Sequence, residues 1–161
     1  MDLVFAIGFY RALQTPPFAK YNTTGVITLG ANRILVSHIL VSLHKVVELY
    51  ERYRSVMPPE AANEMRVLRR ELKARGVSEF RHKVVGHIWD SNRKRPLTAR
   101  EVDDALDRVT KGSAEGLLDR FLSWIANIEY PQRPNTVAGI LNSTKDAIMR
   151  EHRILAEELR T

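Results

Sequence analysis

Cysteine is absent from this sequence of 161 residues, which excludes disulfides, thiolate nucleophiles and cysteine-ligated zinc. No apolar run is long enough to span a membrane, because the longest, residues 33–50, is interrupted by Arg33, Lys45 and Glu48. The opening segment, MDLVFAIGFYRAL, lacks both a basic region and a small-residue cleavage signature, which argues against a signal peptide. We therefore expect a soluble, cytoplasmic protein that has no contact with a membrane.

Acidic residues are outnumbered by basic ones, since 19 Asp and Glu stand against 25 Lys and Arg and leave a net charge of +6. Arginine is the commoner of the two bases, and its forked guanidinium suits phosphate or carboxylate partners. The excess indicates either a polyanionic partner or simply a solvated basic surface. A hydrophobic content of 44% is enough for one compact domain, which we expect to cover residues 1–161.

The hydrophobic residues recur with a helical period, and no segment alternates long enough to indicate a strand. The sequence therefore predicts an all-α fold, a single-domain bundle of about six to seven helices. Residues 14–30 are either a loop or an early start of the second helix. The expected helices cover residues 2–13, 31–55, 59–75, 79–89, 98–111, 114–130 and 136–161.

Local signals support several of these boundaries. Gly76 is placed to close a helix in the left-handed conformation. Thr98 and Glu101 have the spacing of a capping box. Further N-caps are expected at Ser78, Ser113 and Asn135.

The stretch RHKVVGH, residues 81–87, contains an arginine and two of the five histidines. On a helix, Arg81 and His87 would be separated by about 9 Å along the axis and about 120° around it. One copy would therefore make a loose site. Two copies facing each other across a two-fold axis would bring two arginines and two histidines into one cleft, so the spacing favours a homodimer.

Arg81 and His82, followed after four residues by His87, resemble the signature of the HEPN superfamily, and of its abortive-infection-associated bacterial members in particular. The resemblance covers about residues 78–90. It implies a helical bundle that dimerises through the motif helices. Many members are metal-independent endoribonucleases that act as toxins or antiphage effectors, which implies RNA and a protein antitoxin as partners. Other members bind nucleotides, RNA or proteins without catalysis.

The residue types also fit this chemistry on physical grounds. Cleaving RNA without a metal requires a base for the 2′-hydroxyl, an acid for the departing 5′-oxygen and cationic donors on the phosphate. Imidazole titrates near neutral pH, so His87 is the first candidate, and its two-fold mate or His82 supplies the second proton transfer. Arg81 would hold the phosphate. We expect a 2′,3′-cyclic phosphate product, with no metal and no cofactor.

A plainer interpretation of the motif remains open. His87 is flanked by Val85 and Ile88, so it is also typical of a core or interface histidine, with Arg81 on the surface. The protein would then be a helical adaptor or immunity-type domain that binds nucleic acid or protein without cutting it. The pattern places His38 and His44 in the interior and His152 at the surface.

Two basic segments flank the motif and are candidate RNA-binding surfaces. One is a stripe on the helix before the motif, and the other is a loop after it. Both would follow a phosphate backbone in a salt-dependent manner, although a solvated helix face explains the stripe equally well. The residues concerned are Arg70 and Lys73 in the stripe, with Arg66 and Arg69 beside them, and Arg93, Lys94 and Arg95 in the loop.

Overall fold

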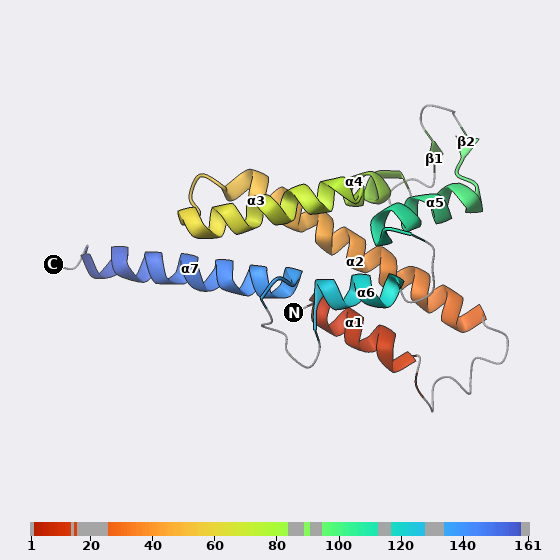
Figure 1. Cartoon of the computed structure of the whole chain (residues 1–161), viewed down its shortest axis with the longest axis horizontal. Helices are drawn as coiled ribbons and strands as arrows, with labels where there is room; N and C mark the ends of the chain where they lie inside the picture. Colours follow the sequence, from red (N-terminus) through yellow and green to blue (C-terminus); the bar gives the residue numbers. More distant parts are fainter. Residues whose placement is uncertain are drawn as a thin grey trace.

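The computed structural model of the chain describes residues 2–13, 15, 26–83, 89–90, 95–112, 117–127 and 134–158. Seven helices account for nearly all of these residues, which confirms the all-α prediction (Figure 1). The helices are α1 (Asp2–Leu13), α2 (Val26–Tyr53), α3 (Pro59–Ala74), α4 (Val77–Phe80), α5 (Ala99–Thr110), α6 (Leu117–Ile125) and α7 (Val137–Glu158). None of the described helices is long and apolar enough to cross a membrane.

The longest helix, α2, is the centre of the bundle. It contacts α1, α3 and α4, and α7 packs on α3 (Figure 1). α5 contacts α4 and α6, and α6 in turn contacts α7. Its buried residues recur at helical spacing, since Ile39, Leu40, Leu43 and Val47 are almost fully enclosed. Fully buried side chains from other helices complete one continuous core, and they include Ile7, Met65, Leu72, Leu122, Ile125 and Val137.

A left-handed residue separates α3 from α4. Gly76 has a φ of 71°, and its N–H donates to the carbonyl oxygen of Lys73 at 2.9 Å. This confirms the prediction that Gly76 closes the helix before the motif. The predicted capping box is confirmed as well, because the side chains of Thr98 and Glu101 each bind the backbone N–H of the other.

Arg75, next to Gly76, connects three helices. Its Nε donates to Glu71 at 2.9 Å and its Nη1 donates to the carbonyl oxygen of Val109, at the end of α5, at 3.0 Å. The guanidinium also lies 4.4 Å from the ring centroid of Trp124 in α6. A cation over an aromatic face is attractive, so this residue stabilises the contact of α5 and α6 with the end of α3.

Three predicted boundaries are wrong. The second helix begins at Val26 and not at residue 31, so the early start is the correct one of the two alternatives for its N-terminus. α6 ends at Ile125, before the expected residue 130. The N-cap of α7 is Thr136, whose Oγ1 accepts the Gly139 N–H, because Asn135 has a φ of 69° and a cap residue needs an extended backbone. The predicted cap at Ser113 lies outside the described residues.

The helix predicted over residues 79–89 is wrong at its end, where Trp89 lies in a strand, and residues 84–88 of it lie outside the described residues. α4 ends at Phe80, and residues 81–83 form a wider, π-type turn. Further on, the short strands β1 (Trp89–Asp90) and β2 (Arg95–Pro96) pair in antiparallel orientation. At Trp89 and Asp90, backbone pairing with Arg95 and Pro96 therefore takes the place of the expected helix.

We predict that Gly76→Ala lowers the free energy of unfolding by about 1–2 kcal/mol, since a Cβ strains a left-handed residue. That Cβ would also lie 3.1 Å from Cδ of Arg108. Gly76→Asn should cost less, because asparagine adopts this conformation more readily. Urea denaturation followed by circular dichroism measures both variants. Equal losses would contradict the backbone explanation and assign the cost to the contact with Arg108.

Candidate functional site

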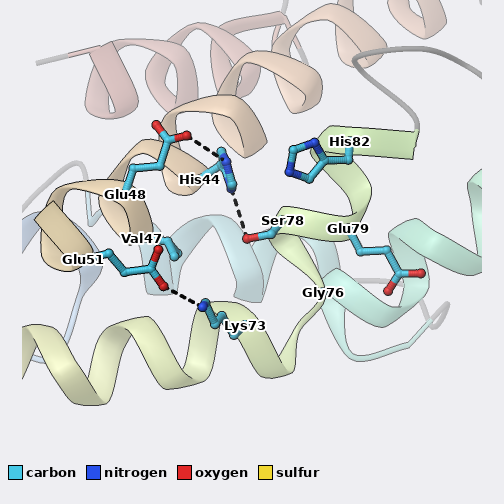
Figure 2. Close-up of a pocket in the computed structure, with 9 residues that line it drawn as sticks. All are labelled: His44, Val47, Glu48, Glu51, Lys73, Gly76, Ser78, Glu79 and His82. Atoms are coloured by element: carbon cyan, nitrogen blue, oxygen red, sulfur yellow. Dashed lines mark hydrogen bonds and ion pairs between the residues drawn. The ribbon is translucent and has the colours of Figure 1, made fainter.

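A pocket of about 530 Å³ opens where α2 passes the junction of α3 and α4 (Figure 2). It contains His82 from the predicted catalytic set and Lys73 from the predicted RNA-binding set. Polar side chains form most of its wall. The lining residues are His44, Val47, Glu48, Glu51, Lys73, Gly76, Ser78, Glu79 and His82.

His44 forms the buried side of this pocket, with 8% of its surface exposed. Its Nδ1 lies 3.0 Å from the hydroxyl oxygen of Ser78, and its Nε2 lies 3.1 Å from a carboxylate oxygen of Glu48. Glu48 follows His44 by one helical turn of α2, whereas Ser78 comes from α4. Both ring nitrogens are therefore engaged, and the imidazole ties α4 to α2.

His82 lies beside His44, and Arg81 holds it there. The two imidazole rings meet edge to face, with centroids 5.4 Å apart and an interplanar angle of 77°. Nη1 of Arg81 is 3.2 Å from Nδ1 of His82. A guanidinium has only donors, so Nδ1 accepts and the neutral ring carries its proton on Nε2. Arg81 and His82, neighbours in the sequence, are thus also in side-chain contact.

Ion pairs neutralise the charged wall of the pocket. Glu51 accepts from Lys73 at 2.6 Å and from Arg69 at 2.8 Å, and these hydrogen bonds lower the pKa of its carboxyl to about 2. Glu79 pairs with Lys83 and Arg108, and the hydrogen bond from Lys83 is the main cause that lowers the pKa of Glu79. The positive charge of Lys73 is thus directed at Glu51.

The other predicted RNA-binding residues lie in different surroundings. Arg70 is exposed on α3, and none of the residues that the structure describes forms an ion pair with it. Arg95 donates to both carboxylate oxygens of Glu101, at 2.9 and 2.7 Å. The remaining predicted residues, His87, Arg93 and Lys94, lie outside the described residues.

Seven of the nine lining residues were not predicted as site residues, and Ser78, His44 and Glu48 are the most informative of them. Ser78 was expected to cap the motif helix, which is wrong, because Gly76 occupies the cap position and the Ser78 hydroxyl binds His44. His44 is buried, as its apolar surroundings predict. Its ring also contacts the ring of His82 in the motif. The spacing of His44 and Glu48, one helical turn apart, could have indicated from the sequence that a carboxylate binds this imidazole. His38 is exposed, contrary to expectation, and His152 is exposed as expected.

Comparisons with protein-family models, with curated proteins and with solved structures give no match. The assignment to the HEPN superfamily therefore stays a prediction that rests on residues 81–87. Within the described part of the chain, no three His, Asp or Glu side chains are grouped in a way that could hold a metal ion.

We predict that Glu51→Gln destabilises the protein near neutral pH and that this loss disappears in acid. The pKa of Glu51 is about 2 in the fold against an ordinary 4.5. A carboxylate with a lowered pKa stabilises the fold above its ordinary pKa, and the stabilisation is lost as the pH falls toward the folded value. The difference between parent and variant should therefore begin to shrink below about pH 4.5 and vanish near pH 2.

Urea titrations at a series of pH values measure this difference in stability. Asp146→Asn is the control. This exposed carboxylate on α7 has a single, long ion pair, 3.7 Å from the amine of Lys145, and should therefore contribute little to stability. A difference between the parent and Glu51→Gln that does not change with pH would show that the ion pairs do not stabilise the fold.

Proposed function

We propose that this chain is a metal-independent endoribonuclease of the HEPN type, acting through Arg81, His82 and His87 where two copies meet. The observation that carries the proposal is the contact of the Arg81 guanidinium with the His82 imidazole at the edge of an open pocket. It places an imidazole, the type of group that transfers protons in metal-free catalysis, next to a guanidinium. The guanidinium is permanently charged and can donate hydrogen bonds to a phosphate. Metal-free cleavage of RNA needs this combination.

In the proposed reaction, one imidazole takes the proton of a 2′-hydroxyl, whose oxygen then attacks the neighbouring phosphorus. A second imidazole gives a proton to the departing 5′-oxygen, and the products are a 2′,3′-cyclic phosphate and a 5′-hydroxyl. Arg81 stabilises the extra negative charge on the phosphate. His82 supplies one imidazole once Arg81 has turned from its Nδ1 to the phosphate, and His87 supplies the other from the same copy or from the second one.

The surface around the motif supports a contact with RNA. Arg70 on α3 is exposed and has no ion pair among the residues that the structure describes, so its charge is available to a phosphate. Lys73 and Arg95 are paired with Glu51 and Glu101, so a phosphate would have to compete with a carboxylate at each of them. We therefore rank Arg70 first among the described RNA-binding candidates. A role as a toxin or antiphage effector, held in check by a protein antitoxin, follows from the resemblance.

We predict that the purified protein cleaves labelled single-stranded RNA in the presence of EDTA and leaves 2′,3′-cyclic phosphate ends. Arg81→Ala, His82→Ala and His87→Ala should each slow cleavage by about 100-fold or more, because each removes a proton-transfer or charge-stabilising group. Gel electrophoresis of the products measures the rates. Sedimentation of the parent is expected to give a dimer.

The matched controls are Arg150→Ala and His152→Ala, which remove exposed residues of the same types from α7 and should leave the cleavage rate unchanged. Equal cleavage by the parent, Arg81→Ala and His87→Ala would refute the assigned roles. Salt-sensitive RNA binding without cleavage would instead favour the alternative, a non-catalytic helical domain that binds nucleic acid or protein as an adaptor or immunity protein.

A further inference from the structure

We infer that Glu48, His44 and Ser78 form a carboxylate–imidazole–hydroxyl relay that makes Ser78 a nucleophile toward uncharged carboxylic esters. This centre lies in the pocket beside the proposed nuclease residues, and its nucleophile, base and carboxylate are all different residues from theirs. It goes beyond the proposed function, because its reacting atom is a serine oxygen and its substrate is an acyl group.

The three groups stand in a continuous chain of hydrogen-bond contacts. Glu48 lies 3.1 Å from Nε2 of His44, and Nδ1 of the same ring lies 3.0 Å from the Ser78 hydroxyl. A carboxylate only accepts, so Nε2 carries the proton and Nδ1 of the neutral ring accepts the hydroxyl proton. The ring nitrogen that faces Ser78 is therefore unprotonated and can act as its base. The Ser-His-Asp triad uses the two nitrogens the other way round, with Nε2 facing the serine. Such relays are recognised by the roles of their members and not by their order in the sequence.

The burial of the relay members suits these roles. His44 is 8% exposed, which shields the base from water, whereas Ser78 is only half-buried and lines the pocket. Figure 2 shows the Ser78 hydroxyl directed at His44, with the His82 ring beside them. A substrate carbonyl in the pocket would therefore meet the serine oxygen on its open side.

His82 provides a donor for the negative charge that develops on the carbonyl oxygen. Arg81 occupies its Nδ1, so the neutral ring presents an N–H at Nε2. The His82 ring borders the same pocket and lies 5.4 Å, centroid to centroid, from the ring of His44. Although His82 is exposed, its N–H stands next to a guanidinium and can donate to an oxyanion in the pocket.

The pocket wall favours a substrate without charge. A carboxylate or phosphate group would need a cation that faces the cavity, and the lysine on its wall, Lys73, is bound to Glu51 at 2.6 Å. Glu79 is likewise paired with Lys83 and Arg108. A volume of about 530 Å³ is in the range of small-molecule sites. These features point to a small, neutral ester.

The reaction proceeds in two balanced steps. Oγ of Ser78 attacks the carbonyl carbon as its proton moves to Nδ1 of His44, and the ester C–O bond then breaks so that the alcohol leaves with that proton. The product is an ester of Ser78. Water, deprotonated by His44, attacks this acyl group and releases the carboxylic acid and the free serine. Ester and water thus give acid and alcohol, with no other reactant.

A fluorophosphonate probe and p-nitrophenyl acetate test this inference on the full chain. The probe is expected to add to Ser78 with loss of fluoride, which mass spectrometry of the peptides would locate, and the ester should release nitrophenol. Ser78→Ala and His44→Gln should abolish both reactions. The matched control is Ser143→Ala, because Ser143 is an exposed serine that also binds a carboxylate, Glu64 at 2.9 Å, but through no imidazole.

Glu48→Gln separates chemistry from folding, since the Glu48 side chain is 60% exposed and its loss should not disturb the core. Glu48 is a positioning residue, so its variant should label at least about 10-fold more slowly than the parent. Glu48→Asp keeps a carboxylate and should recover part of this rate. The absence of a Ser78 adduct in the folded parent would overturn the inference, whether or not RNA is cleaved. Equal labelling in His44→Gln would overturn it too.

Discussion

The left-handed backbone at Gly76 is the constraint on which the candidate site depends. It ends α3 and lets α4 begin at the next residue, Val77, so that Ser78 and His82 line the pocket beside α2. A continuous helix would rotate each of these side chains to another face, because consecutive helical residues are separated by 100°. The hydrogen bond from Ser78 to His44 then holds α4 against α2. Backbone geometry at one residue thus decides whether two histidines become neighbours.

Helices could be predicted from the sequence wherever the signal for their ends is local. Pro59 and Gly76 delimit α3, and the pair Thr98 and Glu101 begins α5, because each acts on backbone groups a few residues away. Prediction failed where distant or competing contacts decide. The segment after Arg81 has a helical pattern, yet Trp89 pairs with Pro96 in an antiparallel ladder. The periodicity of the apolar residues cannot reveal such pairing.

The site shows the same division between local and distant information. Arg81 and His82 could be predicted because they are adjacent and of types that bind phosphate and transfer protons. His44 and Ser78 are 34 positions apart, and only the packing of α4 on α2 brings them within 3.0 Å. An apolar helix that carries a histidine is most often interpreted as core, and for burial that interpretation was correct. Burial alone does not indicate which groups the ring of His44 contacts, and the fold shows that these are Ser78 and Glu48.

Arg75 also couples the pocket to the opposite side of the bundle. The residue next to it, Gly76, lines the pocket, while its guanidinium covers the indole of Trp124 at 4.4 Å. The emission of an indole responds to a charge held so close to its ring. Any movement of the α3 and α4 junction that displaces Arg75 would therefore change the fluorescence of Trp124. The emission of this tryptophan thus reports structural changes at the pocket.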